Sequence, residues 1–294
     1  MENGEFFLTI NSIKHWVKIA GAENGTIPLV IIHGGPGGNN YTFERTIGPY
    51  LEEYATVIYY EQRGCGRSEA PEDKEAYSIP LLISDLEILC NDLKLKKIIP
   101  LGFSFGSELA LEFVLLHPDL VEKVIIQAPT IFCDANNRIP NIQLNGFLQI
   151  AEGNIKKQIK EIINSELNLD EKIDKVWEIV DTETVDKLLF HNRENAKQNR
   201  KLWEESGLIN PGLMFKALKK QQNEVPLLER VAQINIPTLI FVGLYDRNVG
   251  IDLCRDFASK IPNSKLFIFE KSAHFPDIEE SEKYAQIVKD FIFQ

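Results

Sequence analysis

The first feature of this 294-residue chain that could do chemistry is a serine with one glycine two residues before it and another two residues after it. Residues 102–106 read GFSFG and centre on Ser104. An apolar run at 98–101 precedes the motif, and a run with helical spacing at 108–111 follows it. The two glycines permit a sharp strand-to-helix turn that lifts the hydroxyl clear of the sheet. The pattern predicts that Ser104 is a nucleophile, and the alternative is an incidental turn.

A serine hydroxyl becomes nucleophilic only when a base removes its proton, so a histidine is required elsewhere in the chain. His274 lies in a loop directly after the last predicted strand, at the same edge of the sheet as Ser104. We therefore expect His274 to be the general base. The other histidines have structural explanations, in a strand, a glycine-rich loop, a helix end and a charged helical segment: His15, His33, His117 and His191.

Asp246 is the candidate carboxylate that would orient this base. It stands just past an apolar run, in a turn opened by Gly243. Taken alone, Asp246 could instead cap the helix that begins near Gly250. The order serine, aspartate, histidine along the chain favours the catalytic interpretation, because α/β-hydrolases use this order.

A glycine-rich loop at 33–38, HGGPGG, follows another predicted strand. Such a loop can aim backbone N–H groups at the oxygen on which negative charge develops during attack on a carbonyl. We expect the oxyanion donors to be the amides of Gly35 and Phe105, with His33 holding the loop. Phosphate binding is the alternative, but the loop has neither the G-K-[ST] ending nor the G-x-G-x-x-G spacing.

The elements that must position these residues follow an alternating pattern of strands and helices. The later strands are almost continuously apolar, which is typical of a parallel sheet buried on both faces. We predict a mostly parallel, eight-stranded α/β sheet. The predicted strands are 6–10, 15–19, 28–32, 55–60, 98–101, 121–128, 238–242 and 265–269, and the predicted helices between or after them are 79–93, 108–116, 253–261 and 284–292.

The alternation stops over 132–232, where the sequence becomes charged and helical in its spacing. Because the strand pattern resumes afterwards, we interpret this stretch as a helical cap inserted into one catalytic domain made of 1–131 and 233–294. The fold class predicted is therefore an α/β-hydrolase fold with an inserted cap.

Composition excludes several classes of protein. The chain has 43 acidic and 32 basic residues, a formal net charge of −11, which disfavours nucleic acid and anionic membranes as partners. We expect a small-molecule or short-peptide substrate, no cofactor and no metal, and the oligomeric state stays open. The acidic N-terminus and the lack of a long apolar run predict a cytoplasmic protein. The cysteines are expected to be reduced packing thiols: Cys65, Cys90, Cys133 and Cys254.

Five collinear motifs resemble the proline iminopeptidase (prolyl aminopeptidase) group of α/β-hydrolases. They are HGGPGG at 33–38, EQRGCGRS at 61–68, GFSFGS at 102–107, GLYD at 243–246 and SAH at 272–274. The resemblance implies a serine hydrolase that releases an N-terminal residue, often proline, from short peptides. It also implies an acidic cap residue that holds the substrate's amino terminus, and Glu204 in the segment 202–205 (LWEE) is the candidate.

Three residues depart from the group's pattern: Glu61, Phe105 and Arg247. A cation at Arg247, directly after Asp246, would repel an ammonium group. The alternatives left open are an esterase, lactonase or thioesterase on the same scaffold, and a binding protein that has lost catalysis. For Glu204, the alternative is a solvated position on a charged helix.

Overall fold

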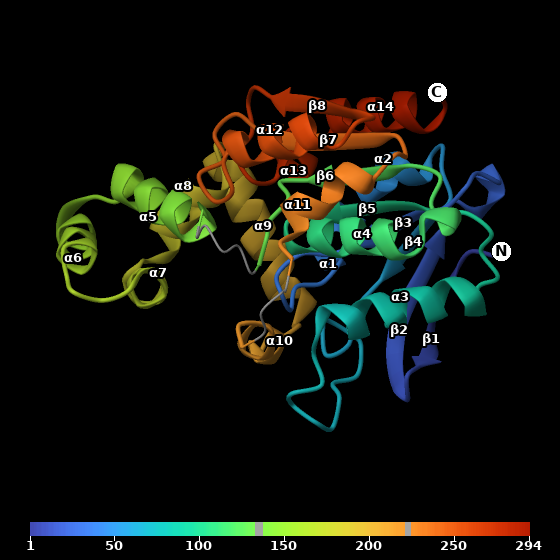
Figure 1. The fold of residues 1–294 in the computed structure, drawn as a ribbon, viewed down its shortest axis with the longest axis horizontal. Coiled ribbons are helices and arrows are strands. Elements are labelled where there is room, and N and C mark those ends of the chain that lie inside the picture. Colours follow the sequence, from blue (N-terminus) through green and yellow to red (C-terminus); the bar gives the residue numbers. More distant parts are fainter. Residues whose placement is uncertain (133–137, 221–224) are drawn as a thin grey trace.

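The computed structural model describes residues 1–132, 138–220 and 225–294, and its core is one eight-stranded sheet (Figure 1). The strand order is β1-β2-β4-β3-β5-β6-β7-β8. The pairs β1–β2 and β2–β4 are antiparallel, and all other pairs are parallel, so the predicted mostly parallel sheet is confirmed. The strands are β1 Gly4–Ile10, β2 Ile13–Ala20, β3 Leu29–Ile32, β4 Val57–Tyr60, β5 Ile99–Phe103, β6 Val124–Gln127, β7 Thr238–Gly243 and β8 Ser264–Phe269.

Each central strand is buried on both faces, which explains its continuous apolar sequence. In β3, Val30 and Ile32 belong to one apolar cluster, and Leu29 and Ile31 belong to the other. Alternate side chains of a strand point to opposite faces, so a strand covered on both sides has no polar face to show.

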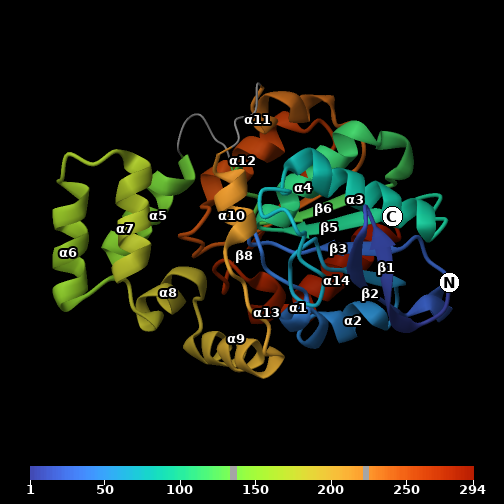
Figure 2. The same cartoon turned by 90° about the horizontal axis from the view of Figure 1, so that it is seen from below.

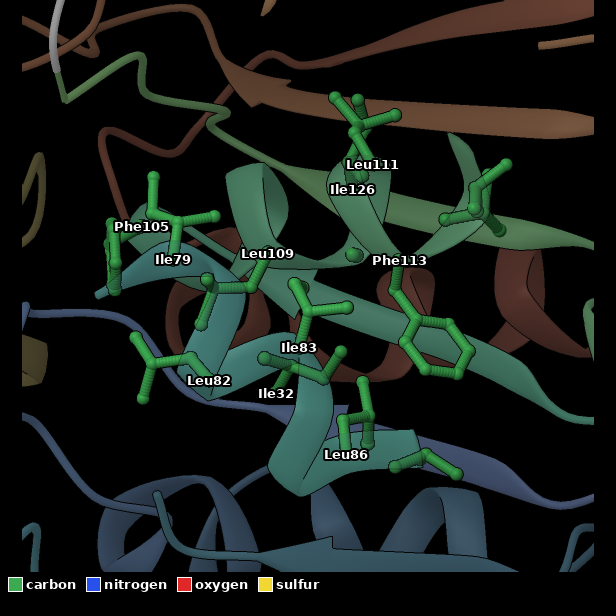
Figure 3. Packing of buried hydrophobic residues seen from close by; sticks show 14 of the residues in the cluster. Ile32, Ile79, Leu82, Ile83, Leu86, Phe105, Leu109, Leu111, Phe113 and Ile126 are labelled. Atoms are coloured by element: carbon green, nitrogen blue, oxygen red, sulfur yellow. The ribbon is translucent and has the colours of Figure 1, made fainter. Parts of the chain in front are cut away.

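Helices cover both faces of the sheet. The helices are α1 Tyr41–Arg45, α2 Gly48–Glu52, α3 Ile79–Asp92, α4 Phe105–Leu116, α5 Arg138–Ile150, α6 Gly153–Ile163, α7 Leu169–Ile179, α8 Thr182–Leu189, α9 Arg193–Ser206, α10 Leu213–Leu218, α11 Leu227–Arg230, α12 Ile251–Lys260, α13 Pro276–Glu279 and α14 Ser281–Ile292. Residues of α3, α4 and α12 pack on one face, and residues of α1, α2 and α14 on the other. Figure 3 shows α3 and α4 side chains against Ile32 and Ile126 of the sheet.

The helices α5 to α11 lie between β6 and β7 in the chain. In both views α5, α6 and α7 stand off one end of the sheet, far from the two termini (Figures 1 and 2). They share an apolar cluster of their own with α8, centred on Phe147. By contrast, Met214 and Leu218 of α10 and Leu227 of α11 belong to the main core. The domain boundaries at 131/132 and 232/233 stay a prediction, and this packing favours a cap that ends before α10.

Three of the cysteines are free and buried: Cys65, Cys90 and Cys254. Burial raises the pKa of the Cys90 thiol to about 12 and that of Cys254 well above its ordinary value, so neither forms a thiolate readily. Cys133 lies outside the described residues. Over the described ranges, no helix has both the length and the apolar character that a membrane span requires.

Candidate active site

The turn around Ser104 joins β5 directly to α4. Ser104 has φ 53° and ψ −122°, a backbone conformation with positive φ that residues with a side chain rarely adopt. A Cβ atom at Gly106 would lie 2.0 Å from the carbonyl oxygen of Ile32, and one at Gly102 would lie 2.2 Å from that of Gly106. Both glycines are therefore required. The helix begins at Phe105, earlier than the spacing predicted, because the turn at Ser104 ends the strand and starts the helix without a connecting loop.

His274 and Asp246 come together from the loops that follow β8 and β7. Nδ1 of His274 lies 3.0 Å from Oδ2 of Asp246. The other oxygen of Asp246 accepts hydrogen bonds from the N–H groups of Asn248 and Val249, at 2.8 and 2.9 Å. Burial works to raise the pKa of Asp246, but His274 and these two amides lower it below its ordinary value. The carboxylate is thus held ionised against His274, and it requires the Nδ1–H tautomer.

Ser104 and His274 line one cavity, of about 810 Å³. In the described part of the chain no hydrogen bond reaches the Ser104 hydroxyl. Nε2 of His274 instead lies 3.3 Å from Nδ2 of Asn248. The serine and the histidine therefore share the site, with the acceptor atom of the histidine turned to a third side chain.

The loop at 33–38 is held by its histidine, as expected. Nε2 of His33 accepts the N–H of Gln62 at 3.1 Å, so its proton is on Nδ1, which donates to the carbonyl of Gly34 at 3.0 Å. Burial lowers the pKa of His33 and keeps it neutral. Gly35 has φ 129°, and a Cβ there would lie 2.5 Å from the amide nitrogens of Gly37 and Gly38.

The two predicted oxyanion donors lie in different elements. Gly35 is part of its lining. Phe105 is the first residue of α4, and the first N–H groups of a helix have no partner within the helix. That these two amides stabilise an oxyanion stays a prediction.

The cavity lies between the sheet and the inserted helices and is mainly apolar. Aromatic side chains from both sides line it: Phe43, Phe103, Phe132, Trp177, Trp203, Phe215 and Phe275. The loop that carries His274 is also tied to the cap, because the N–H of His274 donates to the carbonyl of Leu189 at 3.0 Å. A displacement of the cap would therefore also displace the loop that carries His274.

A sequence profile described as the alpha/beta hydrolase fold matches residues 27–281. The chain belongs to the alpha/beta hydrolase family. Its eight-stranded sheet with helices on both faces is the predicted fold class, which is confirmed.

Sequence relatives of this alpha/beta hydrolase include proline iminopeptidases. The enzyme from Saccharolobus solfataricus is 25% identical over 99% of this chain and 92% of its own length. The enzyme from Heyndrickxia coagulans is 26% identical over 92% of each chain. A proline iminopeptidase-related protein from Thermus thermophilus has the same fold, with a TM-score of 0.80 and 21% identity over 99% of this chain and 97% of its own. The predicted resemblance to this group is confirmed.

Glu204 lies beside the cavity of this hydrolase but not in its lining. The side chain of Glu204 is exposed on α9, whereas its neighbour Trp203 lines the cavity. Arg247 is also outside the lining, and its guanidinium donates to the carbonyl of Tyr245 at 3.2 Å. The cation that departs from the group's pattern therefore does not face the site.

An acidic residue that the sequence analysis missed does line the cavity. Asp277 is 3% exposed and lies three residues after His274. Its Oδ1 accepts a hydrogen bond of 2.6 Å from Gln127, whose backbone carbonyl accepts the N–H of Ser104. Burial raises the pKa of Asp277 to about 6, so the carboxylate is mostly ionised at neutral pH. Its position three residues after His274, at the start of α13, is the one sequence signal that points to it.

Proposed function

We propose that this alpha/beta hydrolase is a serine hydrolase in which Ser104 is the nucleophile, His274 the base and Asp246 the orienting carboxylate. The observation that carries the proposal is the 3.0 Å contact between Nδ1 of His274 and Asp246, on a histidine that shares one cavity with the serine of a strand-to-helix turn. This contact leaves Nε2 free of a proton and able to accept one.

The reaction then proceeds by acyl transfer in two stages. His274 takes the proton of Ser104 as the oxygen attacks the substrate carbonyl, and later gives that proton to the leaving group. The amides of Gly35 and Phe105 stabilise the negative oxygen that forms. Water, activated by the same histidine, releases the acyl group from Ser104.

The substrate class we propose is a short peptide with a free amino terminus, cleaved as proline iminopeptidases cleave theirs. Two observations support it: the sequence relatives carry that name, and the cavity contains the buried carboxylate of Asp277. In an aminopeptidase the ammonium group is attached to the carbon next to the attacked carbonyl, so its anchor must lie close to Ser104. Asp277 meets this condition, because Gln127 donates to its carboxylate and also accepts the N–H of Ser104. Glu204 is the second candidate anchor.

Turnover of proline 4-nitroanilide and of its N-acetylated form tests this substrate class. We expect the free amine to be cleaved at least about 100-fold faster in kcat/KM, because the blocked substrate has no ammonium group to pair with the buried carboxylate. Asp277→Asn should remove most of this preference. Glu204→Gln is the matched comparison. A larger loss of the preference in that variant would identify Glu204, in the cap, as the anchor. Equal turnover of the two substrates would contradict the aminopeptidase proposal.

A carboxylic ester hydrolase is the second candidate function. It is favoured by the mainly apolar lining of the cavity and by the exposed position of Glu204. An esterase, lactonase or thioesterase needs the same nucleophile and base but no amine anchor. Hydrolysis of p-nitrophenyl esters without any cleavage of prolyl amides would support this candidate. A binding protein without catalysis would instead leave Ser104 unlabelled by a fluorophosphonate probe.

A further inference from the structure

A continuous chain of hydrogen bonds joins the cap to the proposed base. The indole N–H of Trp177 on α7 donates to Oε1 of Gln143 on α5, at 3.2 Å. Nε2 of Gln143 donates to Oδ1 of Asn248, at 2.7 Å. Nδ2 of Asn248 lies 3.3 Å from Nε2 of His274. We call these four side chains the cap relay.

The direction of the cap relay is determined independently at its two ends. An indole nitrogen can only donate, so it sets the oxygen of Gln143 as the acceptor and the amide nitrogens of Gln143 and Asn248 as the onward donors. At the other end, Asp246 requires the proton of His274 on Nδ1, which leaves Nε2 as an acceptor. Both ends therefore require that Asn248 donates to His274.

This donation competes with catalysis. The unprotonated Nε2 of a neutral imidazole has one lone pair, and Ser104 needs the same lone pair to lose its proton. Within the described ranges, the Ser104 hydroxyl makes no hydrogen bond, whereas Nε2 faces Asn248. Asn248 is held in this position by the cap, because its own oxygen is bound by Gln143.

We propose that Asn248 is a positioning residue that masks His274 until a substrate fills the cap side of the cavity. The proposal rests on the proposed serine hydrolase function. Gln143, Trp177 and Asn248 all line the cavity, so a substrate that reaches α5 and α7 meets the relay directly. A polar group of such a substrate takes the hydrogen bonds of Gln143, Asn248 turns away, and Nε2 becomes available to Ser104. The relay thus favours substrates that are long enough to reach the cap over substrates that are too short to reach it.

Three substitutions break the relay at different places: Asn248→Ala, Gln143→Met and Trp177→Phe. Each removes a hydrogen bond while keeping the backbone, and the N–H of Asn248 that Asp246 accepts is unchanged. Gln149→Met is the matched control, since Gln149 is an exposed residue of the same helix α5, outside the cavity lining. Thermal unfolding of each variant checks that the fold is retained.

The readouts are the rate of Ser104 labelling by a fluorophosphonate and kcat/KM for p-nitrophenyl acetate, whose acetyl group has no polar atom beyond the attacked carbonyl that could bind Gln143. We expect Asn248→Ala and Gln143→Met each to increase both rates about fivefold, which at 1.4 kcal/mol per factor of ten is the ~1 kcal/mol of one hydrogen bond. Trp177→Phe, at the far end, should give a smaller increase. The Asn248→Ala, Gln143→Met double variant should be no faster than either single variant, because both act on one chain of bonds.

The outcomes separate the relay from the function on which it rests. The masking role would be overturned if Ser104 in the relay variants were labelled no faster than in the unmodified protein. It would also be overturned if the rate increases of the two single variants multiplied in the double variant. The ratio of kcat/KM between a p-nitrophenyl ester whose long acyl chain ends in an amide and the acetate should also fall in the relay variants. If Ser104 is labelled neither in the unmodified protein nor in any variant, the serine hydrolase function itself fails.

Discussion

At Ser104 the backbone conformation is as important as the hydroxyl. The positive φ of this residue and the two glycines around it allow the sharp turn at which Ser104 lines the cavity. His274 approaches from another loop, already paired with Asp246. A hydroxyl, an imidazole and a carboxylate that are far apart in the sequence are thereby brought to one edge of the sheet.

Removing the hydroxyl of Ser104 should abolish hydrolysis. We expect Ser104→Ala to lower kcat for a p-nitrophenyl ester or a prolyl amide by at least about 1000-fold, because the variant lacks the hydroxyl on which the proposed acyl intermediate forms. Circular dichroism should show an unchanged fold. Full retained activity in this variant would exclude Ser104 as the nucleophile.

At the level of single elements, the junction of β5 and α4 depends on close contact with β3. The Cβ of an alanine at position 106 would lie 2.0 Å from the carbonyl oxygen of Ile32, a backbone atom that cannot move alone. We predict that Gly106→Ala lowers the free energy of unfolding by about 2–4 kcal/mol in urea denaturation. Gly4→Ala is the control, because a Cβ at Gly4 meets nothing within 4 Å. Equal stability of the two variants would contradict this account of the turn.

Helix α4 also carries a buried acid, Glu108, that catalysis does not use. Burial raises its pKa to about 8, and its Oε2 accepts the N–H of Phe132 at 2.7 Å. A carboxyl whose pKa is raised in the folded protein binds its proton more tightly there than in the unfolded chain. Its contribution to stability is complete below the unfolded pKa near 4.5 and is lost as the pH rises toward 8.

Replacing this acid with its neutral analogue should remove that pH dependence. We expect Glu108→Gln to match the unmodified protein near pH 4.5 and to gain up to about 4 kcal/mol in free energy of unfolding at about pH 8. Chemical denaturation at several pH values measures the difference. Glu229→Gln, at an exposed position on α11, should leave the pH profile unchanged. A Glu108→Gln variant that tracks the unmodified protein at every pH would mean that the acid is ionised in the fold.

At the scale of the whole molecule, the described residues form a sheet core and a smaller cap cluster on the two sides of the cavity. The sheet and its covering helices form the sheet core, and α5 to α8 form the cap cluster around Phe147. The cavity between them takes Ser104 and His274 from the sheet side, and Gln143 and Trp177 from the cap side. The stability of the cap can therefore differ from that of the sheet.

Truncating the centre of the cap cluster should loosen the cap alone. Phe147 is fully buried, and Phe147→Ala should cost the cap about 3–5 kcal/mol. We expect faster amide hydrogen exchange in α5 to α8, with the protection of β3 to β7 unchanged. Phe293→Ala is the control, because Phe293 is 60% exposed. Uniformly faster exchange across the sheet would show that cap and sheet unfold as one unit.

The sheet could be predicted from the sequence because its signals are local. Runs of β-branched residues between helical patterns identified all eight strands, and the paired glycines identified the turn at Ser104. The bounds of a strand differ from the prediction where its pairing with a neighbouring strand ends. β6 is shorter than predicted, and Val121 forms an isolated bridge to Ile98 outside the strand.

The cavity side of the site could not be predicted in the same way. Trp203 and Glu204 are adjacent, and consecutive residues of a helix point roughly 100° apart, so a small rotation of α9 decides which one faces the cavity. Sequence resemblance pointed to Glu204, and the packing turns Trp203 inward instead. Whether Glu204 nevertheless holds a substrate stays a prediction.

By itself the sequence determined the class of chemistry and the order of the strands along the chain, because both depend on residue types at short spacing. Only the tertiary structure decided what surrounds the base. Gln143, Asn248 and His274 lie in three segments far apart in the chain, and their contacts depend on how the cap sits on the sheet. Side-chain contacts across such separations follow from the summed packing of whole elements, which no short motif records.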